Sequence, residues 1–291
     1  MSFQDDLIIE LRELRKSEAE KNQRLFASLE RLEKRVETQE RQLEQLRHAA
    51  AFPIQNSYFK KVVANQLGYL ETVEYVAERK VSLARFGDGE IGLACHAYRS
   101  LEFQTGSPQL SRALQNVLSD YRPNLLVGLP GFVADTTWLT MFARYWGVLE
   151  EVLPPSRTWG VSSVSRANAF AYHREALVDA WRACWEGRNV TVVTGRGSRF
   201  DPIDELFSNV GDINFEYGPT RNAFESLDQL TVQLLEKPLD LVIVALGPAA
   251  TILAARLSDR GVQTLDIGHI SNSYEQIFRN GPVPESLPIK R

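Results

Sequence analysis

The sequence lacks the features that mark several specialised classes of protein. Its 291 residues include only two cysteines, Cys95 and Cys184, which form no CxxC pair, so a disulfide framework and a structural zinc site are excluded. The net charge of −4 gives no basic excess, and we expect no nucleic acid partner. No apolar run approaches the ~20 residues of a membrane span, and the acidic start, MSFQDD, has no apolar signal core. We therefore expect a cytoplasmic protein without a membrane span, for which peripheral membrane association stays open.

Residues 1–50 contain neither glycine nor proline, although the whole chain has 18 and 13 of them. Apolar residues recur there in alternating steps of four and three, which is the heptad repeat of a coiled coil. One seam position holds Leu29, Val36 and Leu43, and the other holds Leu25, Leu32 and Leu46, with Gln39 as an interruption. Toward the N-terminus, the same two seam positions are occupied by Asn22, Glu18 and Arg15, and then by Leu11 and Ile8. We predict self-association as a parallel coiled coil of two or three chains; the alternative is one helix folded back on its own globular domain.

Residues 51–58 are predicted to be a hinge, and residues 59–291 a separate domain. Short runs rich in Leu and β-branched residues alternate there with helical patterns, which is typical of an α/β fold, Rossmann-like, with a mostly parallel sheet and flanking helices. The predicted strands are 80–86, 124–128, 159–163, 189–194, 240–246 and 262–267. The predicted helices are 59–78, 90–98, 108–120, 135–147, 165–185, 222–236 and 249–259. Because such sheets bind ligands at the carboxyl ends of their strands, candidate site residues are sought there.

The first predicted strand ends in Arg85-Phe86-Gly87-Asp88-Gly89-Glu90. In an extended chain, residues two apart point to the same side, so Asp88 and Glu90 can converge on one Mg²⁺ or Mn²⁺ ion. Gly87 and Gly89 permit a tight turn and the close approach of a ligand, and the Arg85 guanidinium suits a diphosphate. The same residues are also typical of a plain turn.

The loop after the fourth predicted strand is rich in glycine and arginine. It fits neither the dinucleotide fingerprint nor a Walker loop, but its backbone N–H groups and guanidinium groups can bind an anion. The alternative is a tight turn with solvated arginines. The candidate binding residues are Gly195, Gly197, Ser198 and Arg199.

Two more strand ends carry candidate residues. Gly247 and Pro248 precede an apolar helix, and Ala249 lies in its first turn, where the positive helix end favours phosphate. Asp266 and His269 follow the last strand and can bind a ribose, a metal or an acceptor, or supply a base. The alternatives are an ordinary strand–helix junction and a structural histidine.

Five of these segments together resemble the GT-D-type glycosyltransferases, first described as a domain of unknown function. They occur in order over about residues 60–280. The matching segments are RFGDGE at Arg85–Glu90, GRGSRF at Gly195–Phe200, NAF at Asn222–Phe224, ALGP with Ala250-Thr251 at Ala245–Thr251, and DIGHI at Asp266–Ile270. The family commonly has a more acidic stretch after the last segment, where this chain has Ser271-Asn272-Ser273-Tyr274-Glu275.

The resemblance implies a metal-dependent transferase that moves a hexose from a nucleotide-sugar donor, typically a UDP-sugar. It assigns metal and donor binding to Asp88 and Glu90. An inverting reaction would also need a base for the acceptor hydroxyl, and the candidates are Asp88, Glu90 and His269; whether the reaction inverts or retains stays open. The acceptor would be a surface polysaccharide, a glycolipid or a glycoprotein. Two alternatives are a coiled-coil scaffold with a degenerate nucleotide-sugar-binding domain and a nucleotide-sugar hydrolase.

Overall fold

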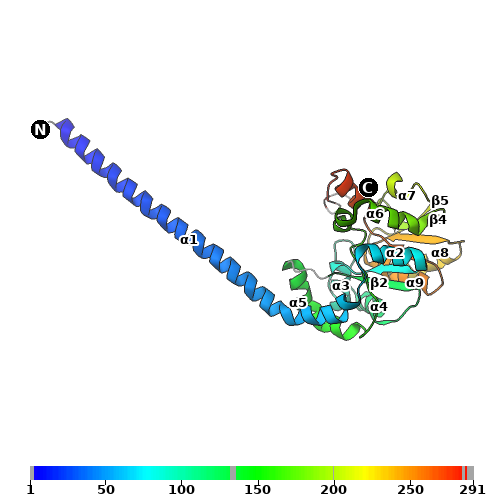
Figure 1. Cartoon of the computed structure of the whole chain (residues 1–291). Helices are drawn as coiled ribbons and strands as arrows, with labels where there is room; N and C mark the ends of the chain where they lie inside the picture. The colour runs from blue at the N-terminus through cyan, green and yellow to red at the C-terminus, as the bar shows by residue number, and fades with distance from the viewer. Residues whose placement is uncertain (1–2, 132–135, 199, 284–285, 287–291) are drawn as a thin grey trace. The chain divides into compact units, whose positions relative to one another are not determined.

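The computed structural model describes residues 3–131, 136–198, 200–283 and 286 (Figure 1). The chain divides into two compact units, Met1–Pro53 and Ile54–Arg291. In the first unit every described residue belongs to helix α1, Phe3–Lys61, whose last turns lie in the second unit. The predicted helix is therefore present, while its self-association stays a prediction.

The predicted hinge at 51–58 is helical. Pro53 lies inside α1, and the boundary between the units falls directly after it. A proline within a helix removes one backbone hydrogen bond but does not by itself end the helix, so the sequence change at this point was a poor guide to local structure. The predicted helix at 59–78 is interrupted instead: α1 ends at Lys61, and α2 begins only at Tyr69, after Gly68.

The second unit is built on a seven-stranded, all-parallel sheet, which confirms the predicted fold class. The strand order is β3-β2-β1-β7-β6-β4-β5. Neighbouring strands pair in parallel throughout, for example Leu83 with Leu265 where β1 meets β7. The strands are β1 (Ser82–Arg85), β2 (Leu125–Leu129), β3 (Gly160–Val161), β4 (Asn189–Gly195), β5 (Asp212–Gly218), β6 (Leu241–Ala245) and β7 (Thr264–Asp266).

Helices cover both faces of the sheet. One apolar core lies under α3 (Asp88–Cys95), α4 (Pro108–Ser119), α5 (Thr136–Val152), α8 (Leu227–Leu235) and α9 (Pro248–Ser258). The other lies under α2 (Tyr69–Arg79), α6 (Ala167–Trp185), α7 (Asp204–Phe207) and α10 (Ile270–Phe278). Connections toward β3 use the first face and connections toward β5 use the second, as expected when all crossovers have the same hand.

Strand β5 and helices α7 and α10 were not predicted. In β5, Asp212, Asn214 and Glu216 alternate with Ile213 and Phe215, which gives a weak apolar signal. The structure places β5 at the edge of the sheet, beside β4 only, where polar side chains alternate with apolar ones and most residues are exposed. Its identity as a strand therefore depends on pairing with β4 rather than on its own composition.

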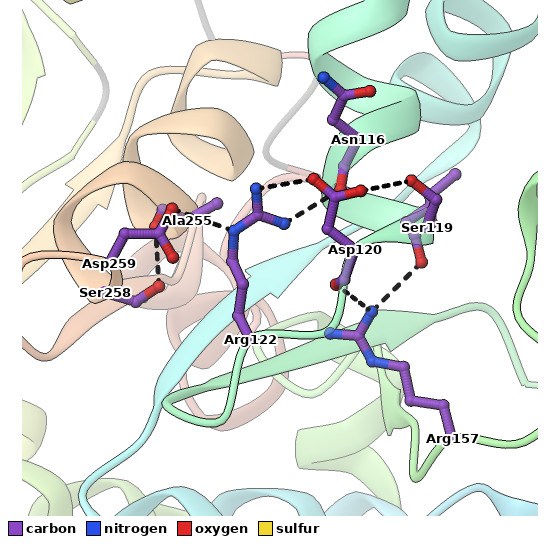
Figure 2. A network of polar contacts seen from close by, with 9 residues as sticks. Asn116, Ser119, Asp120, Arg122, Arg157, Ala255, Ser258 and Asp259 are labelled. Carbon is purple, nitrogen blue, oxygen red and sulfur yellow. Dashed lines mark hydrogen bonds and ion pairs between the residues drawn. The ribbon is translucent and has the colours of Figure 1, made fainter.

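The end of α4 is held by two arginines near the amino ends of the strands (Figure 2). Arg122 Nη1 donates to the Asn116 carbonyl at 3.0 Å, and its guanidinium pairs with Asp120 at 3.2 Å and Asp259 at 3.1 Å. Arg157 Nη1 donates to the Asp120 carbonyl at 3.2 Å. Burial, and then the nearby Arg122 charge, lower the pKa of Arg157 to about 10, so it stays cationic at neutral pH. Both cations complement the negative end of the helix.

Within the described residues, no helix combines the length and apolarity that crossing a membrane requires.

Candidate active site

The centre of the carboxyl edge is fixed by Arg85, the last residue of β1. Its Nη2 pairs with Asp266 Oδ1 at 2.9 Å, and its Nε donates to the Asp266 carbonyl at 2.7 Å. Its Nη1 donates to the Ser162 carbonyl at 3.1 Å and to Ser165 Oγ at 2.8 Å. Arg85 therefore ties β1 to β7 and to the segment after β3, and most of its donors are already used by the protein. The sequence did not point to Ser162 or Ser165.

Asp266, the last residue of β7, is buried. Burial raises the pKa of its carboxyl, while the charge and hydrogen bonds of Arg85 oppose that rise. Thr251 of α9 donates to the Arg85 carbonyl at 2.9 Å and lies 3.5 Å from Asp266 Oδ2. This surrounded carboxyl positions Arg85.

Asp88 and Glu90 are not in the extended conformation from which their convergence was predicted. They are the first and third residues of α3, which begins directly after Gly87. Residues two apart in a helix are rotated by about 200° and do not face each other. Asp88 is exposed, whereas Glu90 is partly buried and accepts a hydrogen bond on Oε2 from the Gly87 N–H at 2.9 Å.

The electrostatics of Glu90 are unusual for a surface helix. Burial, and then the charge of Asp266, raise the pKa of Glu90 to about 7, against the lowering effects of the Gly87 N–H and Arg85. A carboxyl with this pKa exchanges its proton near neutral pH, as a general base does. Gly89 has a packing role here, because a Cβ at this position would lie 3.1 Å from Leu101 Cδ1.

The loop after β4 is a tight turn held by Ser198. Its Oγ bonds to Thr194 Oγ1 at 2.6 Å and accepts the Phe200 N–H at 3.2 Å. Gly197 has a φ of +73°, a conformation that glycine adopts without strain. Arg196 lies over the Tyr217 ring at 5.3 Å from its centroid. Gly195 ends the strand. Arg199, predicted to bind an anion, lies outside the described residues.

The junction of β6 and α9 follows the prediction from sequence. Gly247 is the N-cap with a φ of +55°, and α9 begins at Pro248, followed by Ala249. A Cβ at Gly247 would lie 2.6 Å from the Phe103 ring. Phe103 is in turn held by its carbonyl, which accepts the Asn222 N–H at 2.9 Å. No sequence pattern pointed to Phe103, because isolated aromatic residues are common in loops.

The turn after β7 leads into α10. Gly268 has a φ of +51°, and a Cβ there would lie 2.5 Å from Arg85 Nη2, so glycine allows the arginine to lie against the turn. His269 is the partly exposed N-cap of α10. In the first turns of the helix, buried polar atoms have no hydrogen-bond partner among the described residues: Ser271 Oγ, Asn272 Oδ1 and Ser273 Oγ.

The described residues contain no group of three or more His, Cys, Asp or Glu side chains arranged to hold a metal ion. Arg85 and Asp266 form an ion pair, and the charges of both residues act on the pKa of Glu90. Gly195, Gly197 and Ser198 follow β4, and Gly247 to Ala249 follow β6. Those candidate residues that the structure describes therefore lie along the carboxyl edge of one sheet, which is where parallel α/β sheets bind ligands.

Comparison with known proteins agrees with this architecture. Over 223 residues the chain is 30% identical to glycosyltransferase GlyD of Streptococcus pneumoniae serotype 4, covering 72% of this chain but only 27% of that protein. A solved domain of unknown function 1792 superposes with a TM-score of 0.71 at 27% identity, covering 83% of this chain and 90% of the other. A glycosyltransferase of the same domain class from Streptococcus sanguinis gives a TM-score of 0.66 at 26% identity, covering 75% and 85%. Residues 83–290 match the family described as the glycosyltransferase GT-D fold, and the chain belongs to this family of glycosyltransferases.

Proposed function

We propose that this chain transfers a hexose from a nucleotide diphosphate sugar, most simply a UDP-sugar, to a hydroxyl group of a glycan or glycoconjugate. The proposal includes polysaccharide, glycolipid and glycoprotein acceptors. Its main support is the family match together with Asp88, Glu90 and Arg85 at the carboxyl edge of the sheet. The chain spans about a quarter of the length of GlyD, so the substrates of that larger protein do not transfer directly.

A divalent cation fits the chemistry of Asp88 and Glu90. Both are hard oxygen donors in the first turn of α3, and a Mg²⁺ or Mn²⁺ site with one or two carboxylates is normally completed by substrate phosphates and water. A cation would also favour the ionised form of Glu90, which its surroundings disfavour. When bound, the ion would neutralise charge on the leaving diphosphate. In the structure Glu90 bonds to Gly87, so binding both carboxylates requires Glu90 to change rotamer.

The diphosphate finds suitable groups at two helix ends. The first turns of α9 and α10 contain no acidic residue of their own, so their backbone N–H groups can attract an anion. The hydroxyl groups of Ser271 and Ser273 need partners, and a phosphate oxygen or a bound water can supply them. The acidic first turn of α3 favours a cation instead. The expected arrangement is therefore an anion at α9 and α10 with its counter-ion at α3.

An acceptor hydroxyl must lose a proton as the new glycosidic bond forms. The candidates for the base are Asp88, Glu90 and His269. Glu90 has a pKa of about 7, which suits proton transfer near neutral pH. A carboxylate bound to a metal is a weaker base, so the roles of metal ligand and base exclude each other for any one residue. A pH profile of transfer, compared among Asp88→Asn, Glu90→Gln and His269→Gln, separates the three candidates.

Calorimetric titration of UDP, with and without Mn²⁺, tests the donor site. We expect binding that requires Mn²⁺ in the native chain and is lost in Asp88→Ala/Glu90→Ala. Asp204→Ala is the matched control, because Asp204 is an exposed acidic residue in the first turn of another helix, α7. Absence of UDP binding under both conditions would refute the donor assignment. Equal binding by the double variant would refute the metal assignment alone.

Product analysis separates transfer from the two alternative functions. A transferase forms a glycoside whose yield depends on acceptor. Release of free hexose at the same rate without any acceptor would identify a nucleotide-sugar hydrolase. Binding of the nucleotide sugar with neither product would identify a scaffold with a degenerate site.

A further inference from the structure

Helix α1 carries an apolar stripe that no other described residue of the first unit covers. The six seam side chains are 45% to 67% exposed: Leu25, Leu29, Leu32, Val36, Leu43 and Leu46. They lie at alternating spacings of three and four residues, apart from the Gln39 position, and so form one line along the helix. The stripe is too narrow to be one face of a globular core and matches a coiled-coil seam.

A helix of this composition is not expected to be stable alone. Apart from the stripe, its surface is dominated by charged and polar residues, and isolated helices gain too little from intrinsic propensity to stay folded in water. Packing of the stripe against a partner of the same periodicity supplies the missing burial. The partner must therefore present a heptad repeat of matching length, which a second copy of this chain does.

Polar positions within the seam indicate the orientation of that second copy. In a parallel, in-register pair, Asn22 faces Asn22 and Gln39 faces Gln39, so each amide can hydrogen-bond to its equivalent. An antiparallel pair that matches Asn22 with Gln39 sets Leu43 against Glu18 and Leu46 against Arg15. The parallel pair instead sets Leu43 against Leu43. In the parallel pair, however, Arg15 faces Arg15 and Glu18 faces Glu18. The repulsion between these like charges confines stable packing to the part of the helix from Asn22 onward.

Charges beside the seam favour the same arrangement. Arg35 precedes one seam position and Glu40 follows the next, and in a parallel pair such residues of the two chains lie side by side. Two Arg35–Glu40 contacts of opposite charge form by symmetry. We propose that α1 is the dimerisation surface of this protein, where two copies pair as a parallel, in-register coiled coil over about residues 22–46.

Light scattering on the full chain tests the stoichiometry. Val36→Glu places a charge in the seam, whereas Thr38→Glu adds the same charge on the outer face of the helix. We expect the native chain and Thr38→Glu to have the mass of two chains, and Val36→Glu the mass of one. A native mass of one chain or of three, or two chains for Val36→Glu, would overturn the proposal.

A charge exchange tests the orientation. Arg35→Glu alone and Glu40→Arg alone each place like charges opposite each other in a parallel pair, so each should dimerise more weakly than the native chain. Mixed together, the two variants restore both attractive contacts, and mixed dimers should exceed the statistical half of the population. Mixed dimers at only the statistical level would overturn the parallel register. Neither result depends on donor binding, so the proposal stands or falls separately from the transferase function.

Discussion

The raised pKa of Glu90 predicts that the native carboxyl destabilises the domain at neutral pH. Its pKa is about 7 in the folded protein and 4.5 as the ordinary value, because burial and the Asp266 charge disfavour the ionised form. Glu90→Gln keeps an oxygen that can accept the Gly87 N–H and removes the ionisation. We therefore expect this substitution to stabilise the fold above neutral pH while it impairs transfer.

The direction of this pH effect depends on whether the folded or the unfolded chain loses the Glu90 proton at the lower pH. Below pH 4.5 Glu90 is protonated in the folded and unfolded chains, so the carboxyl carries no penalty. Between pH 4.5 and about 7 only the unfolded chain ionises, and the native protein loses stability relative to Glu90→Gln. The full shift corresponds to about 3 kcal/mol above that range. Since Glu90 is partly exposed, we expect about 2 kcal/mol, or roughly 4–8 °C in Tm.

Urea denaturation of the two proteins from pH 4 to 8.5 measures the difference. Glu71→Gln is the matched control, because Glu71 Oε2 accepts the Gly68 N–H at 2.8 Å in the same arrangement at the start of α2, but the residue is exposed. The stability difference for Glu90→Gln should grow between pH 4.5 and 7, and the difference for Glu71→Gln should not. A constant difference for Glu90→Gln, or one that shrinks with pH, would refute the reasoning.

Addition of Mn²⁺ extends the same experiment to the metal proposal. A cation bound by Asp88 and Glu90 stabilises the ionised carboxyl, so the native protein should gain stability with Mn²⁺ at pH 8 and gain less at pH 5. Glu90→Gln should gain little at either pH. Equal stabilisation of both proteins by Mn²⁺ would show that the ion binds elsewhere.

Three further predictions concern the stability of the second unit. Gly247→Ala should cost about 2 kcal/mol, because φ is +55° and the new Cβ would meet the Phe103 ring, and a double-mutant cycle in urea with Phe103→Ala should show coupling between the two positions. Asp266→Asn leaves the Arg85 guanidinium without its ion pair and should cost about 3 kcal/mol in the same assay; because it also lowers the pKa of Glu90 in the folded protein, the stability difference between Glu90→Gln and Glu90 should stop growing at a lower pH. Arg157→Met should lower the urea midpoint by the equivalent of about 2 kcal/mol, since helix α4 loses a donor to its final carbonyls; an unchanged midpoint would refute the capping role.

The sequence predicted the central strands of the sheet better than its edge. Strands β1, β4 and β6 contain Leu83, Val192 and Ile243, which are fully buried and stand within apolar runs. Such runs arise where both faces of a parallel sheet are covered, so the local pattern and the tertiary environment agree. Strand β5 lies at the edge and faces water, and its alternating polar residues carry no equivalent signal. Amino-acid composition therefore identifies a strand in this sheet only where the strand is buried and its residues are apolar for that reason.

Residue types at the site were predictable, but their conformation was not. Gly87-Asp88-Gly89-Glu90 fits an extended turn and a helix start equally well, since aspartate and glutamate favour the first turn of a helix while glycine permits either conformation. The contacts that decide between the two conformations lie outside the motif. Ile91, Leu93 and Ala94 pack in the core against other elements, and they reach these positions when α3 is helical from Asp88 onward. The helix separates the two carboxyls and turns Glu90 toward Gly87 and the charge of Asp266. Two equivalent acidic residues in the sequence thereby become an exposed carboxylate and a carboxyl that titrates near neutral pH, and this difference allows Asp88 and Glu90 to have different roles in transfer.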